Sequence, residues 1–302
     1  MENFKLSFTD NTTYAGKDLA GFYSNVLLTG VAKESFKLIP NVKSTAKLGK
    51  LNLGKILQDA DCSFGGQGEG TLSQKTVEAH DVKINLEYCI KTFEANYLGE
   101  LYRPGNQNDL PTSVEEFLKG QVAKQISNDL EEITWKGSGA TNATYFTSER
   151  GLEAKLLADG TVIDVTATTL TAANIVAQIG RVYDAMPAAV RQSEDAAIYV
   201  SYAAASFYRQ ALAAASSEMY FMQNHSELSF LGVKIIPCSI STNKMVAAEK
   251  ANLLLITDLV SDMDELLILP QRTVTGAPVV RMVGGFKFGV DFIYGAEIVY
   301  YN

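Results

Sequence analysis

The chain has 302 residues, and 47% of them are hydrophobic, which is enough to bury a sizeable core in one or two domains. Its 26 basic and 34 acidic residues give a net charge of −8, and without any lysine or arginine block this argues against a surface that grips nucleic-acid phosphates. No apolar stretch approaches the roughly 20 residues of a membrane span, and the N-terminus lacks a secretory signal, so we expect cytoplasmic synthesis and no membrane association.

The first third of the chain predicts an arm followed by extended structure. Residues 1–35 read as an N-terminal arm with a short helix, and residues 36–98 as a long two-stranded excursion around the glycine-rich reversal FGGQGEG. Period-2 alternation is most regular at Val82, Ile84, Leu86 and Tyr88. Because an isolated two-stranded ribbon is marginal in water, we expect another chain to cover it.

Within this excursion, LGKLNLGKI comes close to a phosphate-binding loop. Gly49, Gly54 and Lys55 have the spacing GxxxxGK, but Ile56 stands where a Ser or Thr should meet Mg²⁺. A phosphate loop also needs a helix that begins at the lysine, whereas these residues lie in a glycine-punctuated extended segment. We therefore interpret the glycines as bends and the lysines as residues that keep an exposed ribbon soluble.

A long helix is the strongest local prediction. In PTSVEEFLKGQVAKQISNDLEEITWKG, apolar residues recur every three or four positions, and capping-box residues follow Pro111. The pattern predicts a helix over 113–135, about 35 Å long at about 1.5 Å per residue, with one narrow buried edge. We expect Trp135 to be a core anchor.

Beyond this helix the pattern changes to alternating helices and strands. Residues 170–270 predict one α/β lobe that includes AAIYVS, a helix capped by Ser201, and the short buried strands LGVKIIPC, NLLLITDL and DELLILP. The C-terminal GFKFGVDFIYGAEIVYYN returns to strand, with Phe286, Phe288, Val290 and Phe292 on one side and Lys287, Gly289 and Asp291 on the other.

The sequence holds no recognisable catalytic, metal or cofactor motif. It lacks GxSxG and HExxH, and its three cysteines, Cys62, Cys89 and Cys238, form no CxxC pair, so we expect each to be a small buried apolar side chain. We read His80 and His225 as structural. The acidic residues Asp258, Asp262, Asp264 and Glu265 leave one alternative, a metal-dependent enzyme, although a solvated turn is the simpler interpretation.

The order of these parts resembles the major capsid proteins of tailed bacteriophages with the Hong Kong 97 (HK-97-like) fold. DCSFGGQGEGTLSQKTVEAHDVKINLEYC and ANLLLITDLVSDMDELLIL, followed by GFKFGVDFIYGAEIVYY, are similar to capsid proteins of phages that infect Bacteroidota. The resemblance implies an α+β fold divided as follows: N-terminal arm 1–35, extended β-hairpin loop with flanking strands 36–98, peripheral domain 99–169 with the spine helix, α/β axial domain 170–271, and return strand 272–302.

The resemblance also implies a function. The expected protein is a structural subunit, not an enzyme, that forms hexamers and pentamers in an icosahedral shell around double-stranded DNA, without sequence-specific binding. It would be assembled in the bacterial cytoplasm and found in the virion, with portal, scaffold and minor capsid or decoration proteins as partners. The extended loop would contact neighbouring subunits through Lys50, Leu51, Leu53, Lys55, Ile56 and Phe64.

Two alternatives remain open within this resemblance. The same fold would suit an encapsulin-type compartment, which encloses cargo protein instead of DNA. Some relatives also crosslink a loop lysine to an asparagine of the next subunit; Lys50 or Lys55 could serve as the lysine here, but no acceptor matches by motif.

Overall fold

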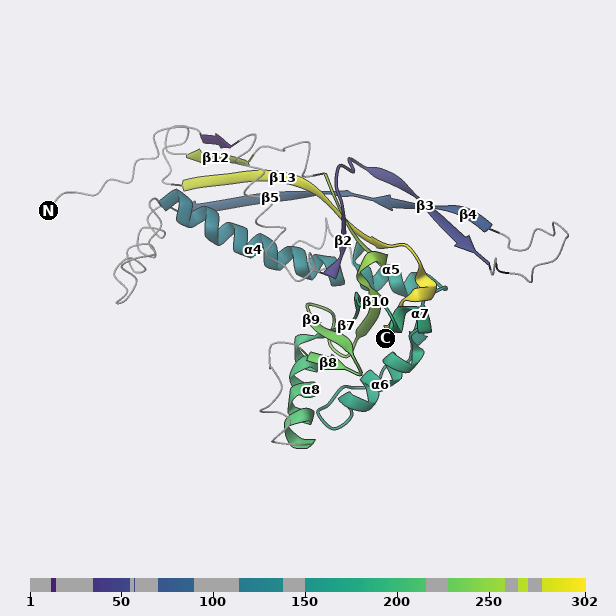
Figure 1. The fold of residues 1–302 in the computed structure, drawn as a ribbon. Coiled ribbons are helices and arrows are strands. Elements are labelled where there is room, and N and C mark those ends of the chain that lie inside the picture. The colour runs from purple at the N-terminus through teal and green to yellow at the C-terminus, as the bar shows by residue number, and fades with distance from the viewer. Residues whose placement is uncertain are drawn as a thin grey trace.

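The structure is a computed structural model that describes residues 12–14, 35–54, 57, 70–89, 114–137, 150–215, 228–258, 266–270 and 279–302. These residues form an elongated body, a second lobe below it, and a hairpin that projects from one end (Figure 1). None of the helices among them is both long and apolar enough to span a membrane.

The elongated body is a sheet built around one long strand, β13. This strand pairs antiparallel with β5 on one side and with β12 and β11 on the other, while β1 extends the sheet beyond β12 and β2 extends it beyond β11. The strands are β1 (Thr12–Tyr14), β2 (Lys37–Ile39), β5 (His80–Cys89), β11 (Leu253–Thr257), β12 (Leu266–Pro270) and β13 (Val279–Phe292).

Helix α4 (Val114–Lys136) runs along β5 and β13 in the elongated body (Figure 1). Its buried stripe contains Val122, Ile126, Leu130 and Ile133, which belong to the same core cluster as Ile84 of β5 and the phenylalanines of β13. The predicted helix is thus confirmed with its boundaries shifted by one residue. The proposed capping-box residues 112 and 113 lie outside the described residues.

The second lobe is a six-stranded sheet flanked by helices, with strand order β6-β14-β10-β7-β9-β8. Its strands are β6 (Ile163–Val165), β7 (Ala196–Ser201), β8 (Leu228–Phe230), β9 (Val233–Cys238), β10 (Met245–Glu249) and β14 (Val299–Tyr301). Its helices are α6 (Ile175–Ala185), α7 (Ala188–Arg191) and α8 (Tyr202–Ala215), and α5 (Leu152–Ala158) lies between lobe and body. The predicted cap is confirmed, since Ser201 Oγ accepts the N–H of Ala204 at 3.2 Å.

One core joins the body to the second lobe. Trp135, at the end of α4, is fully buried, and its ring lies 5.4 Å from that of Phe36 and 5.2 Å from that of Tyr199 in β7. Tyr199 also donates a hydrogen bond of 3.1 Å to the carbonyl of Ser35. The predicted anchoring role of Trp135 is confirmed, and it ties the two parts together.

Three expectations need correction. The runs NLLLITDL and DELLILP form β11 and β12, which pair with β13 in the body and not with the strands of the α/β lobe. The final strand β14 lies inside the lobe sheet, between β6 and β10, instead of returning to the body. An apolar run is buried in either sheet, so its composition does not choose the partner.

The cysteines also differ from expectation. Cys238 is fully buried, as expected, but Cys89 is exposed at the end of β5, and Cys62 lies outside the described residues. Cys89 falls on the exposed side of the same alternation that buries Ile84, so the strand's period overrides the residue's usual preference.

Candidate assembly surface

The projecting hairpin consists of β3 (Thr45–Leu53) and β4 (Gly70–Glu78), which pair only with each other among the described strands. Leu48 lies opposite Lys75, and Leu51 lies opposite Leu72. Since directly opposed residues project from the same face of an antiparallel pair, and neighbours along a strand from opposite faces, this register divides the hairpin into two faces.

The inner face of the hairpin rests on the body of the same chain near the hairpin base. Val77 is fully buried, and Ala46 and Leu48 are partly buried beside it. Their apolar seat belongs to the body: Ile39, Val42, Leu254, Ile256 and Ile293. The base is closed by a backbone hydrogen bond of 2.8 Å from Ala79 to Ser44.

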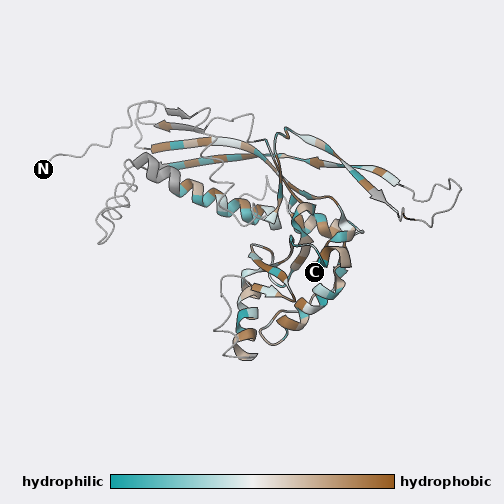
Figure 2. Ribbon diagram, viewed as in Figure 1, coloured by the Kyte–Doolittle hydropathy of each residue, from teal (hydrophilic) through white to brown (hydrophobic). Residues whose placement is uncertain are grey.

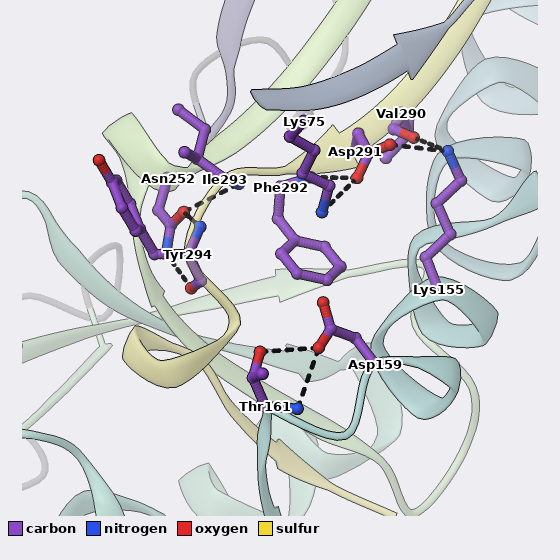
Figure 3. Close-up of polar contacts among 10 residues, drawn as sticks. All are labelled: Lys75, Lys155, Asp159, Thr161, Asn252, Val290, Asp291, Phe292, Ile293 and Tyr294. Atoms are coloured by element: carbon purple, nitrogen blue, oxygen red, sulfur yellow. Dashed lines mark hydrogen bonds and ion pairs between the residues drawn. The ribbon is translucent and has the colours of Figure 1, made fainter. Parts of the chain in front are cut away.

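Farther along the inner face, contacts become ionic and aromatic (Figure 3). Lys75 Nζ lies 3.0 Å from Asp291 Oδ1 and 3.5 Å from the ring centroid of Phe292. The other carboxylate oxygen of Asp291 accepts a hydrogen bond of 3.2 Å from Lys155 of α5, and Lys155 also donates to the carbonyl of Val290 at 2.6 Å. Asp291 is only 6% exposed, and its charge is therefore balanced by two lysines from different elements.

Strand β3 of the hairpin has an aromatic partner in the body, Tyr294. Lys50 Nζ lies 4.9 Å from the ring centroid of Tyr294, and the Tyr294 hydroxyl donates a 3.3 Å hydrogen bond to the carbonyl of Leu51. Tyr294 is held in turn by buried Asn252, whose side chain donates to the Tyr294 carbonyl at 2.8 Å and accepts from its N–H at 2.7 Å (Figure 3).

The outer face has no such cover among the described residues. Leu51 is 51% exposed and Leu72 is 76% exposed, although they lie directly opposite each other and form one apolar patch, which we call the leucine pair. Leu57, just beyond β3, is 94% exposed. Hydrophobic segments occur on the projecting hairpin as well as in the body (Figure 2). The leucine pair, exposed on this projection, is the candidate contact site.

The structure separates the predicted contact residues. Leu51 is on the outer face, but Lys50 is on the inner face against its own Tyr294. The backbone of Leu53 ends β3 opposite Gly70, and Lys55, Ile56 and Phe64 lie outside the described residues. Their contacts with a neighbour stay a prediction.

Sequence reasoning missed Leu72 and the two polar anchors Lys75 and Asp291. The outer apolar patch is indicated in the sequence of β3, whose residue Leu51 lies opposite Leu72 of β4. The apolar residues Ala46 and Leu48 of β3 occupy even positions, whereas Leu51 occupies an odd one. This change of phase marks the point where the apolar residue moves from the inner to the outer face.

The alternative chemical readings gain no geometric support. Residues 45–53 form a strand, not the strand–loop–helix of a phosphate site, and Lys55 lies outside the described residues. Asp258 is buried and accepts the Lys287 N–H at 3.0 Å, while Asp262, Asp264 and Glu265 lie outside the described residues. In the described part of the chain, no three His, Cys, Asp or Glu side chains are grouped to hold a metal ion.

Comparison with known proteins gives a fold but no close relative. No family profile and no curated protein matches the sequence. A chain of the satellite phage P4 procapsid, whose structure includes the size determination protein, is 11% identical with a TM-score of 0.59, and the match covers 92% of this chain and 97% of that one.

Two further matches span nearly the whole chain. The capsid of a native GTA particle matches at 11% identity and a TM-score of 0.54, over 99% of this chain and 94% of that one. A virus-like particle from Pyrococcus furiosus matches at 9% identity and a TM-score of 0.52, over 95% and 98%. The chain therefore has the fold of capsid shell subunits.

Proposed function

We propose that this chain is a major capsid protein of the Hong Kong 97 type, which assembles through hexamers and pentamers into the icosahedral shell of a tailed phage. The observation that carries the proposal is the leucine pair, held out on a hairpin whose opposite face is fixed to its own subunit. The capsid-like fold of the whole chain supports it.

The driving force in this proposal is burial of apolar surface between copies. Covering a half-exposed leucine contributes about 1–2 kcal/mol, at about 25 cal/mol per Å² of apolar surface. The leucine pair would then contribute about 2–3 kcal/mol per contact, before the cost of ordering side chains. A contact between two different surfaces gives a closed ring when its rotation divides a full turn, and in a ring modest contacts together yield a stable capsomer.

The finer parts of the proposal concern contents and partners. The shell would enclose double-stranded DNA without reading its sequence, and it would be assembled in the bacterial cytoplasm with scaffold, portal and minor capsid or decoration proteins. The chain's net charge of −8 suits a wall that does not bind the DNA tightly. Lys55, Ile56 and Phe64, beyond the described part of the hairpin, would add to its contact with the neighbour.

Electron microscopy of the purified full-length protein tests the proposal directly. We expect closed shells or rings of five and six subunits from the wild-type chain. A chain that stays monomeric at high protein concentration, with no shell visible under any assembly condition, would contradict the proposal.

A matched pair of variants tests the role of the leucine pair. Leu51→Ser with Leu72→Ser should raise the protein concentration needed for assembly at least tenfold, because about 2 kcal/mol of contact energy is lost. Gln74→Ser, which changes an exposed residue on the same face, should leave that concentration unchanged. Equal assembly by both variants would show that the leucine pair is not at the contact.

The second candidate is a shell that encloses protein, of the encapsulin type. The match to a virus-like particle from Pyrococcus furiosus is the observation that supports this second candidate. The two candidates differ in their contents: nucleic acid inside purified particles, or copurification of a portal protein, indicates a virion, whereas particles that contain a stoichiometric enzyme indicate a compartment.

A further inference from the structure

The hairpin has a narrow attachment at its base, where it joins the rest of the chain. On one strand only Ala79 separates β4 from β5, and on the other, residues 40–44 separate β2 from β3, with Asn41 at a φ of +65°. In contrast, β5 is locked to β13 over ten opposed residue pairs, from His80 to Cys89. The base is therefore the place where the hairpin's direction can change relative to the body.

The side chains beyond the base oppose such a change. Lys75 is one of two inner-face lysines that contact the body, with Lys50, and it joins the hairpin to two neighbouring positions there, through its ion pair with Asp291 and its position over the ring of Phe292. Asp291 is in turn fixed by Lys155 of α5, and its own Oδ1 accepts the Phe292 N–H at 2.8 Å (Figure 3). A carboxylate held by these contacts has little freedom, so it defines one position for the lysine ammonium.

These contacts differ from the apolar seat in what they specify. The seat that Val42 and Leu254 form for Val77 fixes the base but is non-directional, because apolar contacts tolerate rotation. The ion pair and the cation–π contact each require a particular direction and lie farther from the pivot, so they restrict the angle of the hairpin more strongly.

We propose that Lys75 and Asp291 form a latch that sets the angle of the hairpin within the free subunit, so that the leucine pair is already aimed before a second copy arrives. Pre-ordering of this kind lowers the entropy cost of each contact, and it makes the angle between neighbouring subunits a property of one chain. The part of this inference that concerns the shell rests on the proposed function; the latch itself does not.

The test measures the hairpin angle in separate subunits. Donor and acceptor dyes are attached at Thr71→Cys on the hairpin and Leu157→Cys on α5, both exposed positions, in a full-length chain with Cys62→Ser and Cys89→Ser; the remaining Cys238 is buried. Single-molecule energy transfer is recorded at dilutions that keep subunits apart. Far-UV circular dichroism and the unfolding midpoint confirm that each variant is folded.

Lys75→Met removes the charge but keeps a long side chain over Phe292, and Lys47→Met makes the same change on the exposed outer face. We expect a single narrow transfer peak for the wild type and for Lys47→Met, and at least a twofold broader peak for Lys75→Met. Asp291→Asn removes the ion pair but leaves Lys75 over the Phe292 ring, so it should broaden the peak by no more than Lys75→Met does. The double variant should be no broader than Lys75→Met, because no further contact of Lys75 is lost. A narrow peak for Lys75→Met would overturn the latch.

Electron microscopy then separates this inference from the proposed function. If Lys75→Met broadens the transfer peak and gives particles of mixed diameter, where Lys47→Met gives uniform ones, the latch sets the shell geometry. If its particles are as uniform as those of the wild type, the latch does not set that geometry. If Lys75→Met broadens the transfer peak but neither the wild type nor any variant forms particles, the latch is supported and the proposed function is contradicted.

Discussion

The carboxylate of Glu153 in α5 lies 3.3 Å from the ammonium of Lys244, just before β10, and so connects the body to the second lobe. Glu153 is only 6% exposed, and its other oxygen accepts the backbone N–H of Ser241. Lys244 also donates a 2.9 Å hydrogen bond to the hydroxyl of Tyr300 in β14. One buried carboxylate thus holds together segments from three parts of the chain.

Replacing this carboxylate should destabilise the folded chain. Glu153→Ala leaves the Ser241 N–H and the Lys244 ammonium without their partner, which costs about 2 kcal/mol of unfolding free energy because the site is mostly buried. Glu132→Ala is the control, since its i,i+4 pair with Lys136 on α4 is 40% and 33% exposed and contributes about 0.5 kcal/mol or less. Urea unfolding measures the free energy of unfolding of both variants. Equal losses of free energy would show that the buried pair contributes no more to stability than the exposed pair.

The crossing of the hairpin over β13 depends on a glycine. A Cβ atom at Gly289 would fall inside contact distance of the Glu78 carbonyl oxygen and close to the Ala79 Cα, so the two strands would have to move apart. Gly289→Ala should therefore lower the free energy of unfolding by about 2 kcal/mol or more. Gly49→Ala, in β3 of the same hairpin, meets no atom within 4 Å and should change it by less than about 0.5 kcal/mol.

A stabilising substitution is expected at the turn between β8 and β9. Leu231 and Gly232 connect these strands with φ angles of +49° and +89°, the signs of a type I′ turn, in which asparagine is favoured at the first position. Leu231 is 70% exposed and so loses little burial when replaced. Leu231→Asn should raise the free energy of unfolding by about 1 kcal/mol. Leu231→Val should lower it, because a β-branched side chain suits positive φ least.

Acid should weaken the body near the hairpin base. Burial lowers the pKa of His80 below its ordinary 6.5, and the charges of Arg150 and Lys155 act in the same direction, against the opposing effects of Glu78 and Asp81. As pH falls through 6.5, the unfolded chain binds the proton before the folded one does, so stability decreases. The free energy of unfolding, measured from urea unfolding curves between pH 8 and 5, should show this decrease. This pH interval spans the ordinary pKa of histidine.

The control for this prediction is His80→Gln, which cannot take up a proton. This variant should show a smaller loss of stability over the same pH interval than the wild type. An identical pH dependence in the two proteins would assign the acid effect to other groups.

Local patterns predicted most of the secondary structure of the body. The alternation in β5 gives its inner face correctly, since Ile84 is buried while Lys83 and Asn85 are exposed. The apolar stripe of α4 gives its packing edge, including Val122 and Leu130. These patterns work because each element has one wet side and one dry side, and the period of the residues follows the geometry of the backbone.

Strand partners and the contacts of the hairpin were not predictable in this way. β11 is buried over its whole length, so its sequence has no period that would indicate its place in the sheet. The alternation in β13 placed Gly289 and Asp291 on the side opposite its phenylalanines but did not show that both are buried, where the hairpin and α5 cover them. The pairing of Lys75 with Asp291 joins distant parts of the chain. The sequence around a lysine does not indicate whether its ammonium group has a carboxylate partner in the fold.

The position of β14 has a consequence for synthesis of the chain. Its three residues fill the place between β6 and β10, and without them those two strands have no common neighbour. On a translating ribosome, the lobe sheet therefore remains in two separate pieces until residues 299–301 emerge. Strand β6 therefore joins the rest of that sheet only after those residues have been made.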